Sequence, residues 1–429
     1  MATDAAGRDG MMTGMQGGKL KPGWRRVKFG DVVRLSKARC ADPLAEGLDR
    51  YVGLEHLEPG DLRIRSWGNV ADGTTFTNVF KPGQVLFGKR RAYQRKVAVA
   101  EFSGVCSGDI YVLESKDTSV LLPELLPFIC QTDAFFEHAV GTSAGSLSPR
   151  TNWTSLANYQ FVLPSMEEQE WILALASAQY ELVQSLQDAR HEAQTLKRSS
   201  RDYLFSNGLS STPQYLTGFV FPIPSEWEPI RLPDIVEARY GLVDGPFGSN
   251  LKSEHYRSEG IPVVQSAFVA KGWFDKEATN YVFVDEEKYQ SEIRSSVGPG
   301  DIVMVKIGVN CGACARLPAD HPIGILAGNC LKIAVNSKVC DAQFLLHYLH
   351  WLRERKVLER LIHSTQQKAL SLANLKMVSI GIPSIAEQEA IAAILDDCDS
   401  GIASIENRLF SARQGLRQIS ARLEKLDVH

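Results

Sequence analysis

The sequence predicts an α+β protein made of two tandem mixed α/β globules, each followed by one long helix, with a pseudo-two-fold internal repeat. Three observations predict this fold. The chain of 429 residues repeats several segments at nearly constant spacing. Short runs of β-branched and aromatic residues between Gly, Pro and Asp are typical of strands. Two Pro-free segments of about 40 residues are typical of long helices.

The repeat is clearest around the start of each long helix. Residues 163–172, Leu-Pro-Ser-Met-Glu-Glu-Gln-Glu-Trp-Ile, match residues 382–391, Ile-Pro-Ser-Ile-Ala-Glu-Gln-Glu-Ala-Ile, at an offset of 219. Ser-Leu-Ala-Asn occurs at 155–158 and again at 371–374, an offset of 216 that a three-residue insertion reconciles with the first. Residues 24–33 also parallel 227–236, and residues 82–89 parallel 299–306. Because such self-similarity marks a repeated architecture, we predict two copies of one unit.

Within each copy, strands are expected before the helix. The clearest candidates are residues 84–87 and 97–99 in the first copy and 302–305 and 331–335 in the second. Long helices are expected over 166–205 and 385–426, because each segment follows Pro-Ser and carries Glu in its first turn. The predicted boundaries are a disordered leader at 1–22, the first globule at 23–165, a central helical spacer at 166–207, a linker at 208–225, the second globule at 226–383 and a C-terminal helical spacer at 384–429.

An apolar seam marks both predicted helices. In the second helix it follows a heptad pattern through Ile402, Ile405, Leu409, Ala412, Leu416, Ile419, Leu423 and Leu426. In the first helix it is looser and runs through Leu175, Leu182, Ala189, Leu196 and Tyr203, with Ile172, Leu186 and Ala193 beside them. An ordinary amphipathic helix buries its seam against its own globule. However, about 40 residues form a rod of roughly 60 Å, longer than a globule of about 140 residues covers. We therefore predict that the two helices pair as an antiparallel coiled coil.

Composition excludes several classes of protein. Apolar residues make up 44% of the chain, aromatic residues 9%, and the formal charge is −3, values that are typical of a globular protein and not of a disordered or fibrous one. The sequence contains no run of about 20 apolar residues, and residues 1–22 lack the apolar centre of a signal peptide. We therefore expect a cytoplasmic protein. Eight cysteines without regular spacing indicate reduced thiols.

Signatures of catalysis are weak. The sequence has no phosphate-binding GxxxxGK[ST] loop, and the Gly-Pro-Phe-Gly at 245–248 more simply makes a turn. Cys311 and Cys314 have the spacing of half a zinc site, but no second pair accompanies them, which favours a buried turn. His347 and His350 lie in an apolar run, where core or surface histidines are commoner than metal ligands. We predict no catalytic residue, metal or cofactor on this chain.

One region concentrates positive charge. Residues 78–100 contain no acidic residue, and they include the aromatic Tyr93 among six cations: Lys81, Lys89, Arg90, Arg91, Arg95 and Lys96. Such residues contact DNA phosphates, arginine also reads guanine, and an aromatic ring can stack. The alternative is a charged, solvated loop. The first globule has 17 basic and 15 acidic residues, whereas the two helical segments have 4 against 7 and 5 against 8. The second globule, at 18 against 18, weakens this contrast.

The whole pattern resembles the specificity (S) subunits of type I restriction-modification systems. Residues 51–57, Tyr-Val-Gly-Leu-Glu-His-Leu, and residues 85–96, Val-Leu-Phe-Gly-Lys-Arg-Arg-Ala-Tyr-Gln-Arg-Lys, followed by Gly-Val-Cys-Ser at 104–107, resemble one class of target-recognition domain. Residues 244–252, Asp-Gly-Pro-Phe-Gly-Ser-Asn-Leu-Lys, and residues 259–264, Glu-Gly-Ile-Pro-Val-Val, resemble another. The Pro-Ser-x-x-Glu-Gln-Glu helix starts are similar to the repeated regions of the family.

The resemblance implies a function and a set of partners. Each globule would be a target-recognition domain that reads half of a bipartite site in double-stranded DNA, and the paired helices would act as a ruler between them. Two methyltransferase (modification) subunits would dock on the helices and bring S-adenosylmethionine, and two endonuclease/translocase (restriction) subunits can join such complexes in phage defence. In the second domain, the contacts of the first carry over only to Lys306, and Lys252, Gln366 and Lys368 are looser candidates.

Two hypotheses compete with this interpretation. One is a coiled-coil scaffold whose globules bind protein, in which case the cations at 81–96 serve only solubility. The other is an enzyme with an unfamiliar site around Cys311 and Cys314. The second globule has Ile307 and Gly308 where the first has Arg90 and Arg91, so the two globules are expected to differ in what they bind.

Overall fold

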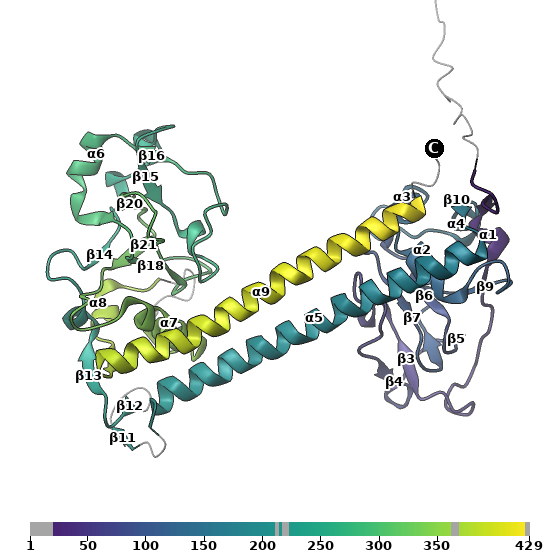
Figure 1. The fold of residues 1–429 in the computed structure, drawn as a ribbon, viewed down its shortest axis with the longest axis horizontal. Helices are drawn as coiled ribbons and strands as arrows, with labels where there is room; N and C mark the ends of the chain where they lie inside the picture. Colours follow the sequence, from purple (N-terminus) through teal and green to yellow (C-terminus); the bar gives the residue numbers. More distant parts are fainter. Residues whose placement is uncertain (1–19, 211–213, 217–222, 362–368, 425–429) are drawn as a thin grey trace, which may run out of the picture. The chain divides into compact units, whose positions relative to one another are not determined.

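The computed structural model describes residues 20–210, 214–216, 223–361 and 369–424. These residues form two compact units, each of which combines a globule with parts of both long helices (Figure 1). Unit 1 contains the chain up to Asp188 and from Asn407 onward, and unit 2 runs from Ala189 to Glu406. The predicted leader lies almost entirely outside the described residues, as does Leu426.

The globule of unit 1 contains two four-stranded sheets. The first has the order β2 (Val33–Leu35), β9 (Ile110–Ser115), β6 (Val85–Gly88) and β7 (Val97–Val99), with every pair antiparallel. The second has the order β4 (Gly68–Asn69), β3 (Arg50–Val52), β8 (Gly104–Cys106) and β5 (Asn78–Phe80), in which β3 and β8 are parallel. A separate pair joins β1 (Arg25–Lys28) to β10 (Gln160–Leu163) just before the long helix.

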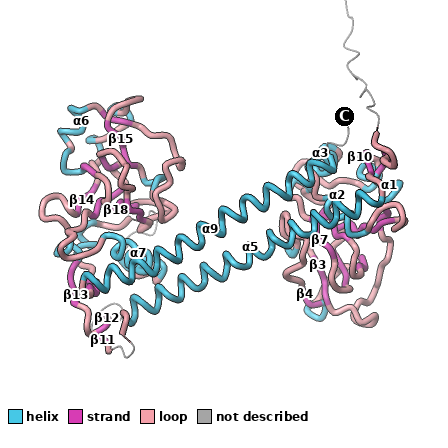
Figure 2. The backbone as a smooth tube through the Cα atoms, in the orientation of Figure 1, coloured by secondary structure: helices cyan, strands magenta, loops and turns pink. Residues whose placement is uncertain are grey.

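Short helices cover the first of these sheets. They are α1 (Phe29–Val32), α2 (Leu126–Cys130), α3 (Asp133–Gly141) and α4 (Trp153–Ala157). Phe29, Phe87 and Phe135 are fully buried in one apolar cluster with residues of α2 and β6. The strands are short and the connections long, as Figure 2 shows, so side-chain packing supplies much of the order.

The globule of unit 2 repeats the same strand order. The first sheet is β14 (Leu242–Asp244), β21 (Cys330–Ile333), β18 (Ile302–Val305) and β19 (Cys314–Arg316). The second is β16 (Phe283–Val284), β15 (Ile261–Val264), β20 (Gly324–Leu326) and β17 (Ser296–Val297), again with one parallel pair, β15 and β20. The strands β13 (Glu228–Arg231) and β22 (Ser379–Ile382) pair as β1 and β10 do. The predicted internal repeat is confirmed.

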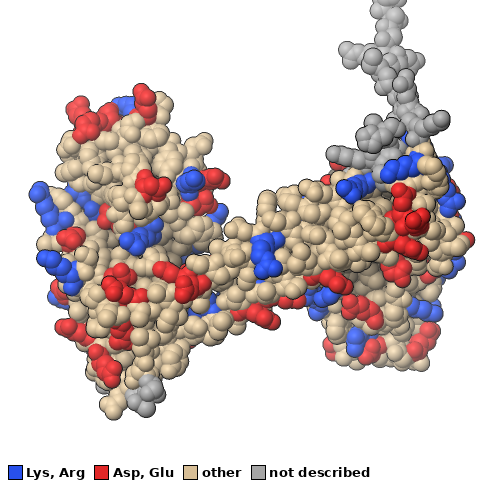
Figure 3. Space-filling view, viewed as in Figure 1, with Lys and Arg blue, Asp and Glu red and all other residues tan. Residues whose placement is uncertain are grey.

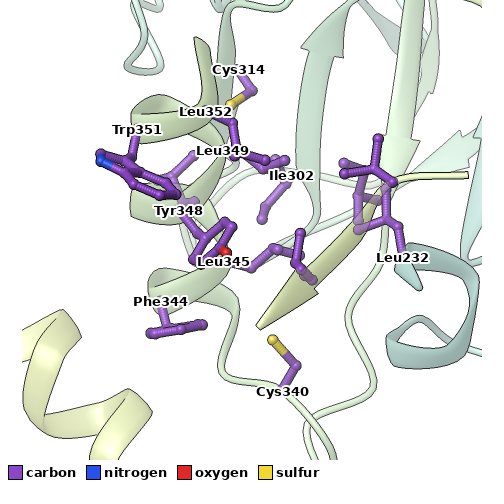
Figure 4. Close-up of a cluster of buried hydrophobic side chains, with 14 of the residues drawn as sticks. Leu232, Ile302, Cys314, Cys340, Phe344, Leu345, Tyr348, Leu349, Trp351 and Leu352 are labelled. Carbon is purple, nitrogen blue, oxygen red and sulfur yellow. The ribbon is translucent and has the colours of Figure 1, made fainter. Parts of the chain in front are cut away.

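The helix α7 (Ala342–Glu354) organises the core of unit 2. Leu349 and Leu352 of this helix lie beside Ile302 (Figure 4), and Phe344 and Tyr348 are buried in the same cluster. Phe205 of the long helix adds a ring whose centroid lies 4.9 Å from that of Tyr348. The remaining described elements of this unit are β11 (Tyr215–Leu216), β12 (Ile223–Pro224), α6 (Glu286–Ser291) and α8 (Leu372–Lys376).

The two long helices, α5 (Met166–Asn207) and α9 (Ile385–Glu424), begin in the same way. Gln169 of α5 is buried; its Nε2 donates to the carbonyl oxygens of Val120 and Pro164, and its Oε1 accepts from the amide of Leu122. Gln388 of α9 repeats this pattern 219 residues later, with Val339, Pro383 and Asp341 as partners. Each glutamine therefore ties the first turn of a long helix to its globule.

The helices pair antiparallel, as predicted. In unit 1, Ile172, Ala176 and Tyr180 of α5 share an apolar cluster with Ile419 and Leu423 of α9. Gln179 also donates to the carbonyl oxygen of Ala412 at 2.8 Å. In unit 2, the end of α5 lies in one core with the beginning of α9: Leu204, Phe205, Ile391, Ala392 and Leu395. The first part of one helix thus lies with the last part of the other.

The two predicted seams have different outcomes. On α9, Leu409, Ala412, Ile419 and Leu423 are buried, and Ile402, Ile405 and Leu416 are half-buried. On α5, the prediction is correct for the buried Leu186 but wrong for Leu175, Leu182 and Leu196, which are 38%, 42% and 63% exposed.

The error on α5 has a physical cause. The helix carries a second apolar face at Ile172, Ala176, Tyr180 and Val183, and all four residues are buried. Trp171 and Leu175 are four residues apart, and so are Ile172 and Ala176. Both pairs therefore have the spacing of one side of a helix, and this spacing does not show which side is buried. The Tyr180 hydroxyl accepts a hydrogen bond from the amide of Leu62 and donates to Asp61, which turns this second face toward the globule.

Replacing Gln388 with Met should destabilise the protein. The change keeps the length of the side chain but leaves the buried Asp341 amide and two carbonyls without their partner, at a cost of about 2 kcal/mol in the free energy of unfolding. Chemical denaturation measures the difference. The control Glu389→Met, at the next and exposed position, should change the free energy of unfolding by less than about 0.5 kcal/mol. Equal stabilities of the two variants would contradict this role of Gln388.

Candidate nucleic-acid interface

The cationic segment of unit 1 forms the turn between β6 and β7. All four residues of β6 are buried, and the cations begin where this strand leaves the sheet. A short 3₁₀ turn, Ala92–Gln94, is flanked by Arg91 and Arg95, which have left-handed φ angles of 53° and 56°. Such a backbone costs about 1–2 kcal/mol at a residue with a side chain, and it occurs often at functional sites. The turn makes this segment the leading candidate for a binding site.

Two of the predicted DNA-binding residues are engaged within unit 1. Arg95 pairs with Asp133, donates to the carbonyl oxygen of Gln131 at 3.2 Å and lies 4.8 Å from the centre of the Phe136 ring. The Lys96 ammonium donates to the carbonyl oxygen of Leu54 at 2.7 Å. Both residues hold the turn against the globule, so their positive charges are partly committed to local contacts.

Arg90 and Arg91 lie beside a loop that approaches from α3. Arg90 and Arg150 face each other in an isolated antiparallel bridge, in which the amide of Arg91 donates to the carbonyl oxygen of Pro149 at 2.7 Å and the amide of Thr151 to that of Lys89 at 3.0 Å. Both guanidinium groups reach the hydroxyl of Ser148, at 3.0 Å for Arg90 and 3.5 Å for Arg91. The loop therefore brings further polar groups to the cationic turn.

Arg150 is a candidate that the sequence analysis missed. Its Nε and Nη2 donate to the two carboxylate oxygens of Asp109 at 2.7 and 3.2 Å, and Arg90 contacts the same carboxylate at 3.4 Å. Hydrogen bonding by Arg150 holds the pKa of Asp109 below its usual range, so this carboxylate stays ionised. Asp109 fixes two arginines beside each other without neutralising both. No sequence pattern links Arg150 to the turn, because it lies 60 residues after Arg90, its partner in the bridge.

The remaining predicted residues of this turn differ in exposure. Lys81 and Tyr93 are exposed, and the Tyr93 ring has no aromatic neighbour among the ring contacts of the described residues. The Lys89 ammonium lies 4.8 Å from the centre of the Tyr111 ring. We define the cationic tip as Lys89, Arg90, Arg91, Tyr93 and Arg150. These assignments to DNA remain predictions.

The matching end of unit 2 has different chemistry. Lys306, the counterpart of Lys89, is only 5% exposed; its ammonium lies 3.2 Å from Asp244 and 4.1 Å from the centre of the Phe247 ring. This burial corrects our expectation of Lys306 as a free phosphate contact. Ile307 pairs with Ala369 as Arg90 pairs with Arg150, so two apolar residues replace two arginines. Lys252 is exposed, and Gln366 and Lys368 lie outside the described residues.

The residues considered for a metal or a thiol-based site have structural roles. Burial raises the pKa of the Cys314 thiol to about 12, and Cys311 donates to the carbonyl oxygen of Lys306. His350 contacts the carbonyl oxygen of Cys314 at 2.9 Å, and burial lowers its pKa to about 4.

Within the described residues, His347, Asp396 and Asp399 have the spacing of metal ligands. However, the ammonium of Lys197 already pairs with Asp399. The side-chain amide of Gln343 donates a hydrogen bond to Asp396, and His347 Nε2 is hydrogen-bonded to the same carboxylate oxygen. We interpret this group as an ionic network that joins α7 to the two long helices inside unit 2.

Charge is mixed over the surface. On the face shown in Figure 3, Lys and Arg side chains alternate with Asp and Glu, and neither sign covers one large continuous area. In the part of the chain that the structure describes, no helix has the length and apolar character needed to cross a bilayer. Any binding of DNA would therefore depend on local clusters such as the cationic tip.

Known sequences similar to this chain come from one family. The sequence model of the type I restriction modification DNA specificity domain matches residues 224–411. The specificity subunit of the type I restriction enzyme MjaVIII from Methanocaldococcus jannaschii is 22% identical over 410 residues, which cover 90% of this chain and 88% of that protein. The specificity subunit of EcoDI from Escherichia coli is 31% identical over 160 residues, 35% of this chain and 33% of that protein.

Solved structures show the same fold. The S subunit of a type I restriction-modification system from M. genitalium has a TM-score of 0.61 and 16% identity, and the match covers 96% of this chain and 98% of that one. A chain from a structure of the assembly and conformational transition of the type I R-M system has a TM-score of 0.56 and 20% identity, with 96% and 99% covered.

Two repeated globules, paired helices and a cationic tip define a two-domain recognition protein. The sequence matches and the fold point to one family. The chain is similar in sequence and in fold to the specificity subunits of type I restriction-modification systems, as the resemblance predicted.

Replacing Arg91 with Ala should weaken the binding of duplex DNA by the full-length chain. Loss of one phosphate contact should reduce the slope of log affinity against log salt concentration by about 1. Fluorescence anisotropy over a series of salt concentrations measures both quantities. The control Lys116→Ala removes an exposed cation that directly follows β9, whereas Asp109 directly precedes that strand. This control should leave the slope unchanged. An unchanged slope for Arg91→Ala would remove this residue from the interface.

Proposed function

We propose that this chain is the DNA-specificity subunit of a type I restriction-modification complex and that its two globules read the two halves of a bipartite target. The observation that carries the proposal is the contrast between matching positions of one repeated fold. Arg90 and Arg150 in unit 1 correspond to Ile307 and Ala369 in unit 2. Arginine favours guanine edges and phosphates, whereas apolar side chains suit thymine methyl groups. Two such tips would recognise different sequences.

Each globule is fixed to the helices in its own unit. A domain that recognises DNA at a set distance from a second domain requires such fixed contacts. In unit 1, Asp61 accepts from Tyr180 at 2.7 Å, and Arg65 donates to Gln184 and lies 3.8 Å from Asp188. In unit 2, Asp202 accepts hydrogen bonds from the Trp351 indole and the Arg355 guanidinium at 2.6–2.9 Å. These contacts support a model in which the length of the helices sets the spacer between the half-sites.

The exposed apolar face of α5 supports docking of partner subunits. Trp171, Leu175 and Leu182 in unit 1 and Leu196 and Tyr203 in unit 2 are between 38% and 63% exposed. Ile394 of α9, the repeat counterpart of Leu175, is 42% exposed. Apolar residues at helical spacing suit a partner helix. We infer that two methyltransferase subunits dock on these faces, one in each unit.

The chemistry of the complex then belongs to its partners. This chain is not an enzyme; the methyltransferase subunits would bind S-adenosylmethionine and transfer the methyl group, and endonuclease/translocase subunits would join for restriction. We place the assembly in the cytoplasm, where it meets both host and phage DNA. The alternative of a protein-binding scaffold without a DNA role gains no support from the relatives, which are named specificity subunits.

A map of modified bases in cells with and without this gene tests the proposal. The expected result is that methylation disappears at one split motif when the gene is deleted and returns when it is restored. The methyltransferase must be shown to be present in both strains. An unchanged map under those conditions would contradict the specificity role.

Inserting seven residues into each long helix should lengthen the spacer. The insertions would follow Asp188 in α5 and Glu406 in α9, where the two units meet along the chain, and a heptad keeps each apolar face in phase. Seven residues add about 10 Å, or about three base pairs, and both half-sites should stay the same. The map of modified bases reads the spacer directly. An unchanged spacer would exclude the ruler.

Replacing Leu182 with Glu should weaken assembly with the methyltransferase by about tenfold, because a charge would enter an apolar interface. The melting temperature of the isolated chain should barely change, since Leu182 is exposed. Size-exclusion chromatography and a binding titration measure assembly. The control Ala174→Glu adds the same charge at another exposed position of α5, outside the apolar face. Equal effects of the two variants would argue against docking on this face.

A further inference from the structure

A large groove lies inside unit 2, between the globule and the helices. Its volume is about 1410 Å³, above the range of roughly 300–1,000 Å³ that is usual for small-molecule sites. Residues 271–274 and 316–319 of the globule form one wall, and parts of α7 line the base. The other wall comes from α5, at Lys197, Arg198 and Arg201, and from α9, at Ile402, Ala403 and Glu406.

The corresponding place in unit 1 is filled by the chain itself. There, the segment between β3 and β4 folds onto α5, where Tyr180 and Gln184 receive Asp61, Leu62 and Arg65. The repeat counterparts of Tyr180 and Gln184 are Asp399 and Ala403, which line the groove of unit 2. The counterpart segment, between β15 and β16, contains Trp273, whose side chain is 60% exposed. The same element closes on its helix in unit 1 and leaves an open groove in unit 2.

The groove carries an excess of positive charge. Its lining includes seven Lys and Arg residues and four Asp and Glu residues. Three of the cations have acidic partners: Lys197 with Asp399, Arg201 with Glu354 and Lys271 with Asp275. Arg198, Arg316, Arg353 and Lys356 form no ion pair with any described residue. Four uncompensated cations on facing walls suit an anionic partner.

The groove also offers apolar and acidic groups. The lining also includes the exposed Trp273, the apolar residues Pro299, Leu317 and Pro318, and the acidic residues Glu354, Glu359 and Glu406. A DNA backbone presents a negative charge at each phosphate, so it could use the cations but neither the carboxylates nor the apolar groups of this lining. A polypeptide fits better, because acidic side chains can meet the cations, an apolar side chain can meet Trp273, and backbone N–H groups can meet the carboxylates.

We propose that this groove binds an acidic segment of the methyltransferase subunit that docks on the helices of unit 2. This inference rests on the proposed function. Continuity with the docking face supports it, because the exposed Leu196 stands on α5 between the groove residues Gln194 and Lys197. Since unit 1 fills the matching place with its own residues, only one of the two methyltransferase copies would be held in this way. The two halves of a pseudo-symmetric complex would then differ in affinity.

Photo-crosslinking in the complete complex tests the proposal. The crosslinking residue p-benzoylphenylalanine would replace Trp273 in one variant and the exposed groove residue Ala319 in a second, in case the loss of Trp273 itself weakens binding. A third variant would carry it at Leu196. The complex with purified methyltransferase and duplex DNA is irradiated, and the products are mapped by mass spectrometry.

The expected product at positions 273 and 319 is an acidic segment of the methyltransferase, in at most one copy for each specificity chain. Crosslinks to DNA at these positions would overturn the proposal in favour of a nucleic-acid groove. If position 196 reacts with the methyltransferase while neither groove position does, the groove proposal fails and the proposed function stands. If no position reacts with the methyltransferase, docking on this unit fails as well.

Charge reversal provides an independent measurement. The double variant Arg198→Glu and Arg316→Glu changes two exposed cations on facing walls. It should lower the affinity for one of the two methyltransferase copies by about tenfold and leave the other copy unaffected. The control Lys276→Glu and Lys338→Glu reverses two exposed cations outside the groove and should leave both affinities unchanged. Equal affinities in the test and control variants would overturn the proposal.

Discussion

The buried amide at the fourth residue of each long helix fixes the direction in which that helix leaves its globule. Gln169 and Gln388 each make three hydrogen bonds to backbone groups at equivalent positions of the repeat. An unpaired amide or carbonyl in a buried place is costly, so these bonds admit few other orientations. Pairing of the helices, docking of each globule and exposure of the remaining helix faces all follow from these two starting directions.

A repeated framework lets the two copies diverge where the framework does not depend on them. The strand order and the helix start are the same in both units, because they build the core. The turn after β6 carries arginines, whereas the turn after β18 carries Ile307 at the matching position. The segment that joins β3 to β4 in unit 1, or β15 to β16 in unit 2, differs in a second way. It packs against α5 in unit 1, whereas in unit 2 it lines an open groove beside α9.

Much of this architecture could be predicted from the sequence, because the two copies keep the same residues at several matching positions. The Pro-Ser and Glu-Gln-Glu residues locate both helix starts. On α9, one regular heptad pattern of apolar residues identifies the buried side. The same reasoning failed on α5, where Trp171 and Leu175 compete with Ile172 and Ala176 for the same spacing and only Tyr180 and its partners decide between them. The sequence reveals the cationic turn through its run of Lys and Arg residues. However, the pairing of Arg95 with Asp133 and the position of Arg150 beside this turn depend on tertiary contacts.

The exposed face of α5 and the open groove have a common origin. A helix that is packed on one side by its globule and by a partner helix has one side left, and apolar residues on that side are tolerated only if something covers them. In unit 1, Tyr180 holds the neighbouring loop against α5 through its hydrogen bonds to Asp61 and Leu62. In unit 2, Asp399 occupies the corresponding position on α9 and pairs with Lys197 instead, so the loop that carries Trp273 has no aromatic partner to hold it there. The exchange of Tyr180 for Asp399 at this repeat position therefore removes one of the contacts that hold the loop closed in unit 1.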